Sequence, residues 1–407
     1  MRAAAFPLGA AVTVAQLEDD PHPVLARLRE HEPVSWVPAL DGWLVSRRDL
    51  AMQAMRDPET FTVEDPRFST GQVVGPSMLT LEGEKHKRHR DPFARPFRLA
   101  AVRERFTAPV AQETDRLIDA IAPRGEAELR RELAGPLATA AVMHALGLQE
   151  AGAAEVLGWY DAIVASVTEI TAGRPPTEAG RRGFEALRAA IEPALERGPQ
   201  SSLVAAAAGD GGGLERGEVV ANAAVLLFGG IETTEGMIAN AIAHLLSHPD
   251  QLAAVRAEPE LLANAIEESL RLEPAAAVID RYATRRTELG GAQIGERELV
   301  VLSIAGANRD PSVFPDPDRF DVRRANARLH AAFAHGPHVC IGMHLARLEA
   351  QTAVAQVLER LPGLQLEPGH AAAPSGLVFR KPAALRVRWS AGHEPSGSGH
   401  QGAAGVR

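Results

Sequence analysis

The sequence predicts a mainly helical protein with small β-sheets, an α+β fold. Between positions 50 and 272, most apolar residues recur at the three- and four-residue spacing of amphipathic helices. Short runs that read as strands are confined to positions 34–46, 282–304 and 385–389. These strands do not alternate regularly with helices, which excludes a doubly wound parallel sheet.

In chain order, Val34–Val37 and Trp43–Ser46 flank Asp41–Gly42, the typical pattern of a β-hairpin. A second group of strands includes Tyr282, Ile294 and 299–304, with a turn at Gly290–Gly291, and 385–389 alternates like a strand. The helices that we expect span residues 17–30, 50–55, 102–121, 136–146, 153–167, 183–195, 218–246, 249–257, 259–272 and 342–360.

We expect one folded domain at 17–390. Residues 1–16 are interrupted by Pro7 and Gly9 and read as an irregular lead rather than a signal peptide. Residues 205–213 (AAAAGDGGG) read as a flexible link between helices, and 391–407 as a disordered Gly/Ser/His-rich tail.

Composition narrows the class of protein. The 407 residues carry a formal charge of −9, which argues against a nucleic-acid partner. A single cysteine cannot form an internal disulfide, so nothing indicates an oxidising compartment. No stretch offers 18 apolar residues free of charges and helix breakers, so we expect no membrane span and a cytoplasmic location.

The lone cysteine, Cys340, lies in the segment FAHGPHVCIG, directly before the expected helix at 342–360. Amide groups and the dipole at a helix N-terminus favour a thiolate, and the nearby glycines would let the backbone approach a flat ligand. One alternative is that Cys340 is only a small buried residue of the hydrophobic core. Another is a zinc cluster, which would use His335, His338, Cys340 and His344.

The helix at 218–246 has an unusual middle, GGIETT. Gly229 and Gly230 cost a helix about 1 kcal/mol each against alanine, and Glu232 is an ionisable group in an apolar helix. Close helix packing, with Glu232 facing water, is one explanation. The other is a kinked helix over a flat cofactor, with the acid Glu232 and the alcohol Thr233 placed to deliver protons.

The cysteine segment resembles the haem-binding loop of the cytochrome P-450 family: Phe, two residues, Gly, three residues, Cys, one residue, Gly. Phe333, Gly336, Cys340 and Gly342 match, and Ala334 stands where glycine is common. The resemblance extends from about residue 17 to 389. It implies the P-450 fold, a triangular helical prism with haem b between the long central helix and the cysteine-loop helix. Cys340 would be the axial ligand of the haem iron, and Phe333 would pack near the sulfur side of the ring.

Three other segments are similar to motifs of the same family. Glu268 and Arg271 are similar to its structural Glu–Arg pair, with Arg319 as the expected third member. Glu232 and Thr233 resemble its oxygen-activating pair, in which the alcohol bonds iron-bound dioxygen and the acid connects it to solvent protons. The residues that resemble its propionate-binding groups are His86, Arg90, Arg281 and His338.

The resemblance implies a monooxygenase that inserts one atom of O2 into an organic substrate, with an expected role in secondary metabolism. The chain has no room for a fused reductase, so we expect electrons from NAD(P)H through a ferredoxin reductase and a ferredoxin. Lys85, Lys87, Arg88, Arg95 and Arg98 would then attract the acidic partner. Apart from these redox partners, we expect the protein to be a monomer whose only other partner is its small-molecule substrate. A peroxide-driven peroxygenase and a haem sensor or carrier without turnover stay open as alternatives.

By family position, four segments would contact the substrate, and their side chains are mostly small or aliphatic. A medium-sized, largely apolar molecule fits such a pocket. The expected pocket residues are Val74, Met78, Gly229, Ala276, Val278, Ile279 and Val378.

Overall fold

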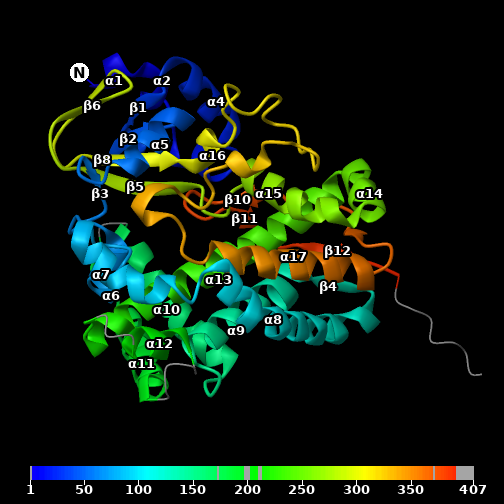
Figure 1. Cartoon of the computed structure of the whole chain (residues 1–407). Coiled ribbons are helices and arrows are strands. Elements are labelled where there is room, and N and C mark those ends of the chain that lie inside the picture. Colours follow the sequence, from blue (N-terminus) through cyan, green and yellow to red (C-terminus); the bar gives the residue numbers. More distant parts are fainter. Residues whose placement is uncertain (1, 172–173, 197–201, 210–212, 370–371, 391–407) are drawn as a thin grey trace, which may run out of the picture.

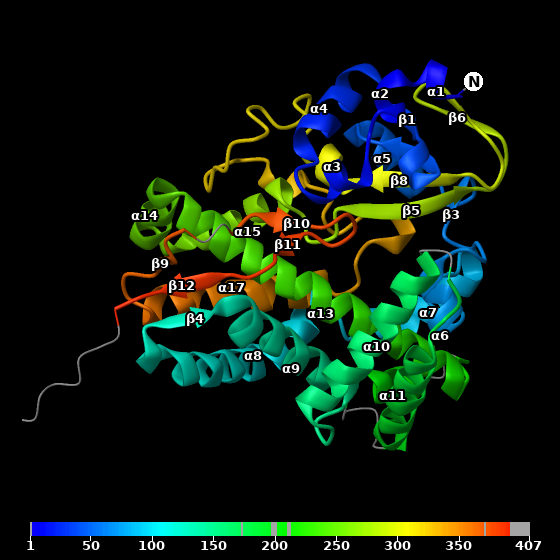
Figure 2. The ribbon, with the colours of Figure 1, turned by 180° about the vertical axis from the view of Figure 1, so that it is seen from behind.

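A computed structural model of the chain describes residues 2–171, 174–196, 202–209, 213–369 and 372–390. It contains a β-rich part, formed by the beginning of the chain and by residues near 280–303, and a larger helical part (Figures 1 and 2). The predicted α+β class is therefore confirmed. The predicted tail at 391–407 lies outside the described residues.

The β-rich part is built on a five-stranded sheet with the order β1-β2-β8-β5-β3. β2 and β8 run parallel, whereas the other neighbours are antiparallel. Asp41, with a left-handed φ of 48°, closes the predicted hairpin between β1 and β2. The strands are β1 (Val34–Val37), β2 (Gly42–Val45), β3 (Phe61–Thr62), β5 (Val278–Ala283) and β8 (Leu299–Ser303).

Short helices cover this sheet. Two predictions about the first 30 residues differ from what the structure shows. Residues 1–16 are not an irregular lead, because α1 (Arg2–Ala5) and α2 (Pro7–Ala10) are helical. The amides of Leu8 and Gly9 donate to the Glu32 carboxylate, which fixes this segment on the sheet. The expected helix at 17–30 is two helices, since α3 ends at Glu18 before a proline-containing corner. The remaining short helices here are α3 (Val14–Glu18), α4 (His22–His31), α5 (Arg48–Arg56) and α16 (Ile304–Ala307).

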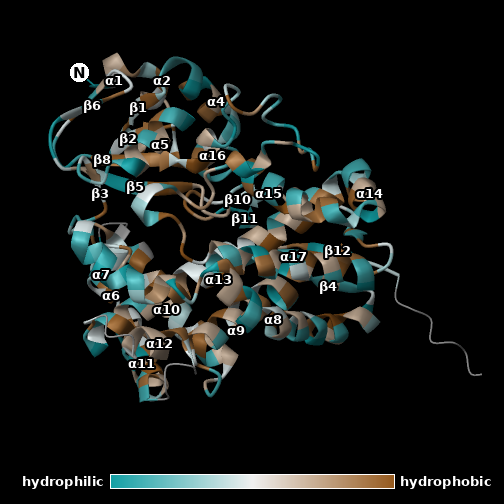
Figure 3. Cartoon of the chain, viewed as in Figure 1, coloured by the Kyte–Doolittle hydropathy of each residue, from teal (hydrophilic) through white to brown (hydrophobic). Residues whose placement is uncertain are grey.

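The helical part surrounds α13 (Arg216–Ser247), which is one uninterrupted helix of 32 residues. The residues of α7 are mainly hydrophilic, whereas those of β2 and β8 are mostly hydrophobic (Figure 3, teal and brown). The other helices are α6 (Ser69–Val74), α7 (Gly83–Ala94), α8 (Leu99–Ile121), α9 (Gly135–Leu146), α10 (Ala153–Thr171), α11 (Glu178–Glu196), α12 (Leu203–Gly209), α14 (Pro249–Ala257), α15 (Leu262–Leu272) and α17 (Met343–Arg360), with a π-helical turn at Arg130–Ala134 and short 3₁₀ turns at Pro38–Leu40, Ala122–Arg124, Pro259–Leu261, Ala327–Leu329 and Gly336–His338.

The prediction of a flexible link at 205–213 is wrong for residues 205–209, which belong to α12. Ala205 and Ala207 lie in α12 and are buried, because alanine is a strong helix former with a small side chain that packs closely. Residues 210–212 lie outside the described residues.

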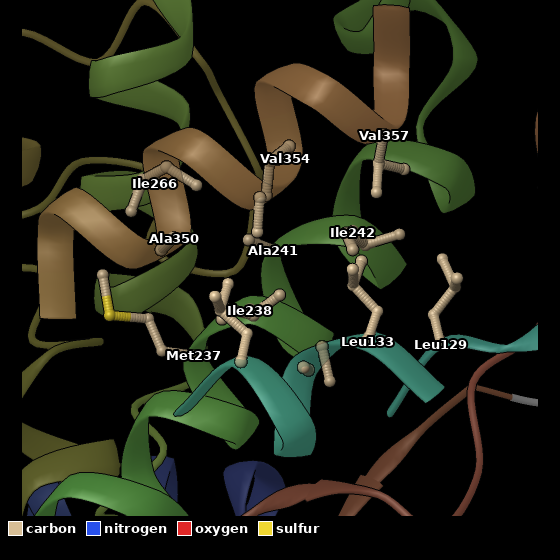
Figure 4. Close-up of a cluster of buried hydrophobic side chains, with 14 of the residues drawn as sticks. Leu129, Leu133, Met237, Ile238, Ala241, Ile242, Ile266, Ala350, Val354 and Val357 are labelled. Atoms are coloured by element: carbon tan, nitrogen blue, oxygen red, sulfur yellow. The ribbon is translucent and has the colours of Figure 1, made fainter. Parts of the chain in front are cut away.

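The main hydrophobic core joins α13 to α17. Figure 4 shows Met237, Ile238, Ala241 and Ile242 of α13 among side chains from α15, from α17 and from the segment at Leu129 and Leu133. Fully burying each large aliphatic side chain contributes about 1.5–3 kcal/mol. The core therefore fixes the helix after the cysteine loop against the long central helix. The core side chains from the other elements include Leu129, Leu133, Ile266, Ala350, Val354 and Val357.

Three small sheets complete the fold. β6 and β7 form the hairpin predicted around Gly290–Gly291, whose φ values are 57° and 86°. β12 lies between β4 and β9, and β10 pairs with β11. These strands are β4 (Glu126–Glu128), β6 (Thr287–Leu289), β7 (Ala292–Ile294), β9 (Gln365–Leu366), β10 (Pro374–Ser375), β11 (Lys381–Pro382) and β12 (Arg386–Arg388).

A buried ion triad ties α15 to the loop before the cysteine segment. Glu268 accepts from Arg271 at 2.7 and 2.9 Å and from Arg324 Nε at 2.9 Å. The prediction of Arg319 as third member is wrong, since its side chain is exposed and only its carbonyl accepts hydrogen bonds from the two arginines. The loop turns between these positions and directs Arg324 inward.

Among the described residues, no helix is long and apolar enough to cross a membrane.

Candidate functional site

The cysteine loop is held in a tight backbone conformation. Gly336 has a φ of 74°, and a Cβ there would lie 2.3 Å from the Met55 carbonyl oxygen, so only glycine fits. Ala334 is also left-handed, with a φ of 56°, which is strained for a residue that has a Cβ. The Cys340 amide donates to the Phe333 carbonyl at 2.8 Å. The loop therefore presents Cys340 directly before α17, as the sequence predicts.

The Cys340 side chain is exposed, yet protein atoms surround it. Burial raises the pKa of its thiol, while the amides of Gly342 and Met343 and the charges of Arg90 and Arg347 act in the opposite direction. The exposed area excludes a thiol used only for core packing. The helix-terminal amides and the two guanidiniums are the groups expected around a thiolate ligand.

The zinc alternative fails on geometry. Among the described residues, no group of three or more His, Cys, Asp or Glu side chains could hold a metal ion. His338 instead contacts the Glu82 carboxylate, with 2.9 Å between Nε2 and Oε2.

Four basic side chains gather near the loop. The rings of His86 and His338 lie 4.3 Å apart, and Arg90 donates to the Val339 carbonyl at 2.5 Å. Arg281 is buried, and burial lowers its pKa while the Glu82 charge opposes the shift. The structure thus links the four residues that the sequence assigns to carboxylate binding.

One ring nitrogen of His86 is free to form a further hydrogen bond. Its Nε2 is buried and has no hydrogen-bond partner within the described part of the chain. Burial, followed by the charges of His338 and Arg90, lowers its pKa to about 4. A buried polar atom without a partner is costly, so His86 fits a site that receives a polar ligand group such as a carboxylate.

Glu82, which no sequence motif singles out, organises this group. Glu82 precedes α7, accepts from the Val63 amide at 3.0 Å and contacts His338. Burial would raise its pKa, but the hydrogen bond from His338 and the charges of His338 and Arg281 hold it below the ordinary value. Its only sequence signal is an acid at the start of a helix, which is common.

The two adjacent glycines in the middle of α13 have different roles. A Cβ at Gly230 would lie 2.4 Å from Val142 Cγ2, so this glycine permits close packing of α9. Gly229 is exposed, and a Cβ there would meet nothing within 4 Å. The close-packing explanation therefore applies to Gly230, whereas Gly229 lies at an exposed position of the helix, and the cofactor role of this segment stays a prediction. The helix itself is uninterrupted.

The acid and the alcohol of α13 have separate partners. Thr233 Oγ1 donates to the Gly229 carbonyl at 2.6 Å. Glu232 accepts from the Tyr160 hydroxyl at 2.6 Å and from Lys381 Nζ at 2.6 Å. Within the described residues, no hydrogen bond joins Glu232 to Thr233, so the expected relay is not assembled in this arrangement.

Phe333 is held from the side of α17. The Arg347 guanidinium lies 4.4 Å from the ring centroid and also bridges to Glu267 at 2.6 and 2.9 Å. Glu267 in turn contacts His330 at 3.0 Å. Phe333 and the cysteine loop are thus anchored to α15.

The expected substrate-contacting residues form two groups. Val74 and Met78 are buried in a cluster that also contains Ile231 of α13. Ala276 pairs with Phe379, next to Val378, which is 43% exposed. The sequence singled out neither Phe379 nor Phe228, whose rings lie 5.7 Å apart in an edge-on contact. Val278 and Ile279 lie on β5 and are half-buried.

The basic run of α7 is largely paired with carboxylates. Lys85 contacts Glu64 at 2.8 Å, Lys87 contacts Glu84 at 2.5 Å, and Arg88 pairs with Glu218. Arg98, just before α8, is exposed. Three of the five predicted docking charges are therefore partly neutralised within the chain.

Comparison with known proteins gives a consistent result. The family model "Cytochrome P450" matches residues 199–368. The cytochrome P450 monooxygenase PikC of Streptomyces venezuelae is 38% identical over 394 residues, which cover 92% of each chain. The 6-deoxyerythronolide B hydroxylase of Saccharopolyspora erythraea is 32% identical, covering 87% of this chain and 93% of that one. The solved structure of CYP109Q5 from Chondromyces apiculatus is 28% identical and matches with a TM-score of 0.83 over 94% of this chain and 97% of that one.

Proposed function

This chain belongs to the cytochrome P450 family and is a P450 monooxygenase, and within that class we propose that it oxidises a medium-sized, largely apolar organic molecule. One atom of O2 enters the substrate and the other leaves as water. The electrons come from NAD(P)H through a ferredoxin reductase and a ferredoxin. The observation that carries the proposal is the Cys340 thiol, which lies at a helix N-terminus, surrounded by protein atoms but with its surface still accessible. In the same region, the buried His86 Nε2 has no hydrogen-bond partner among the described residues.

The residues present fit the family's haem. Cys340 would hold its iron through the thiolate, with Phe333 and Gly342 on either side of the cysteine in the loop. His86, Arg90, Arg281 and His338 would bind the propionates, because guanidiniums and imidazoles are good carboxylate donors and the buried His86 Nε2 has no partner among the described residues. Haem b supplies the redox chemistry that activates O2 when it is bound.

In this proposal Glu232 and Thr233 move protons. A carboxylate and an alcohol next to each other in one helix turn suit general acid work. One proton enters from water at a Glu232 oxygen, Glu232 passes a proton to the Thr233 oxygen, and the Thr233 hydroxyl gives up its own proton toward the reacting oxygen. The exposed backbone at Gly229 leaves space beside Thr233 for that small oxygen species.

The substrate class follows from the apolar lining. The residues named by the sequence are aliphatic or glycine, and the structure adds the Phe228–Phe379 pair. A relative that is named as a hydroxylase of 6-deoxyerythronolide B supports a natural-product substrate and a role in secondary metabolism. Val378 and Phe379, on a loop beside Ala276, would set the size of substrate that enters.

The redox partner would dock near the end of α7 and the start of α8. Arg90 contacts Val339, next to the cysteine, and burial, followed by the charges of Arg347 and Arg103, lowers the pKa of His344 on α17. Exposed Arg98 lies between these positions in the chain and next to Leu99, which is 43% exposed. A basic surface with an apolar contact suits an acidic ferredoxin.

The carbon monoxide spectrum of the reduced protein tests the cofactor assignment. Wild type should give the red-shifted Soret band of thiolate-ligated haem, and Cys340→Ser should lose that band while far-UV circular dichroism is retained. The same shifted band in Cys340→Ser would refute Cys340 as the ligand. A screen for substrate-induced spectral shifts with apolar candidates tests the substrate class, and exclusive response to charged small molecules would contradict it.

Two further measurements test electron supply. Arg98→Glu should lower the rate of reduction by ferredoxin without loss of bound haem, whereas Lys87→Glu, which replaces a cation paired with Glu84, should have a smaller effect. Equal losses from both variants would contradict docking at Arg98. Turnover with hydrogen peroxide and none with ferredoxin, reductase and NAD(P)H would support the peroxygenase alternative instead.

A further inference from the structure

Glu232 and Glu235 lie three residues apart on α13, so their side chains share one face of the helix. Two carboxylates at this spacing repel each other. The structure places Lys381 between them, with Nζ 2.6 Å from a Glu232 oxygen and 2.8 Å from a Glu235 oxygen. The ammonium therefore holds both carboxylates.

The other oxygens of the pair have partners as well. Tyr160 of α10 donates its hydroxyl to the second Glu232 oxygen at 2.6 Å. Arg130, in the π-helical turn before α9, lies 3.1 Å from the second Glu235 oxygen. The side chains of Arg130, Glu232, Glu235 and Lys381 are between 11 and 19% exposed, so water screens these contacts only weakly.

Lys381 is held in place by its neighbours. The adjacent Arg380 is buried, donates to Glu273 at 2.6 Å and bonds backbone carbonyls of the N-terminal segment. The strand lies against Gly236 of α13, where a Cβ would be in ordinary contact with Lys381 Cβ at 3.5 Å and tight against Ala275 Cβ at 3.0 Å. Lys381 is thus a fixed contact, whereas Tyr160 belongs to a helix that packs over α13.

Tyr160 acts only as a donor in this group. Burial, followed by the charge of Glu232, raises the pKa of its hydroxyl, so the phenol keeps its proton. Both Glu232 oxygens are consequently acceptors, one from a phenol and one from an ammonium, while Thr233 bonds the Gly229 carbonyl.

We propose that Tyr160 and Lys381 are positioning residues that form a latch, holding the Glu232 side chain away from Thr233. Release of these two bonds is then required before Glu232 takes a proton from water and passes one to the Thr233 hydroxyl. The proposal rests on the proposed function, in which Glu232 delivers protons. It adds that α10 and β11 control that delivery.

The test uses the holoenzyme without substrate. The protein is reduced with dithionite and mixed with air-saturated buffer, and the return of the ferric spectrum is timed. Lys381→Met and Tyr160→Phe should each speed this return about tenfold, since one charge-assisted hydrogen bond is worth roughly that factor. Lys381→Arg should restore the wild-type rate. Arg130→Met is the matched control, because it removes a cation that contacts Glu235 but not Glu232.

Combined variants separate the latch from a purely structural role. In the Glu232→Gln background, Lys381→Met should no longer change the rate. An effect of the same size in both backgrounds would overturn the latch, and so would a wild-type rate in Lys381→Met. If Glu232→Gln by itself leaves the rate unchanged, the proton role of Glu232 fails, while the haem assignment is judged by the carbon monoxide spectrum.

Amide hydrogen exchange gives a second readout that does not depend on turnover. In the resting holoenzyme, amides of α10 near Tyr160 should exchange faster in both Tyr160→Phe and Glu232→Gln, and no faster when the two are combined. Additive increases would show that Tyr160 acts independently of Glu232 and would overturn the proposal.

Discussion

Replacing Arg324 with alanine should destabilise the protein strongly, and replacing Arg319 should not. Arg324 is 8% exposed and Glu268 is fully buried. Besides the bond to Glu268, the Arg324 guanidinium donates to the carbonyls of Pro315, Asp316 and Arg319 at 2.6, 3.0 and 3.1 Å. The substitution removes one donor from each of these carbonyls and one of the two cations on a buried carboxylate.

Removing one partner of a buried ion pair costs about 3–5 kcal/mol. Arg319→Ala keeps the carbonyl that accepts from Arg271 and Arg324, so its cost should stay within about 0.5 kcal/mol. Urea unfolding of the holoprotein, followed by circular dichroism, should show a midpoint for Arg324→Ala lower by on the order of 1 M.

Arg324→Lys keeps the charge but loses the planar fork, so it should fall between wild type and alanine. This variant also keeps the comparison usable if Arg324→Ala does not fold. The reasoning is refuted if Arg319→Ala shifts the midpoint as far as the Arg324 variants do.

Four further predictions concern one buried acid and three glycines. Glu349 is fully buried, one of its oxygens has no hydrogen-bond partner in the described part of the chain, and burial raises its pKa well above the ordinary value. Its contribution to stability is present below the unfolded-state pKa and is lost as pH rises through the folded-state value. Glu349→Gln should therefore gain stability relative to wild type from pH 5 to pH 8, by at least about 1.4 kcal/mol per unit of pKa shift titrated; a constant difference in urea midpoint would contradict this. In the haem-free protein, Gly229→Ala should raise stability by up to about 1 kcal/mol in urea unfolding, because the new methyl meets no protein atom within 4 Å. Gly230→Ala should cost about 1–3 kcal/mol through the clash with Val142, and Val142→Ala should rescue it; equal effects at both glycines would be inconsistent with the packing. Gly336→Ala should lower haem content, measured as the Soret-to-protein absorbance ratio, because the left-handed backbone and the Met55 carbonyl leave no room for a Cβ; a wild-type ratio would count against it.

Local features carried most of what the sequence predicted correctly. The helices follow the spacing of apolar residues, and the hairpins follow Asp41–Gly42 and Gly290–Gly291, where a few adjacent residues fix the backbone. The cysteine loop is equally local, since its glycines and the following helix lie within a few residues of Cys340.

Contacts between distant segments were harder to predict. Arg319 and Arg324 lie in one irregular loop, and only the path of that loop decides which guanidinium turns toward Glu268. Glu82 precedes an ordinary helix, and its role depends on His338, which lies 256 residues away in the chain.

The sequence by itself determined the fold class, the position of Cys340 before a helix and the presence of an acid and an alcohol in the middle of the longest helix. These features arise from periodicity and short-range backbone geometry. Only the tertiary structure decided that Glu232 faces Tyr160 and Lys381 rather than Thr233. That direction depends on where α10 and β11 pack against α13, because a side chain turns toward whichever donors the fold brings to it.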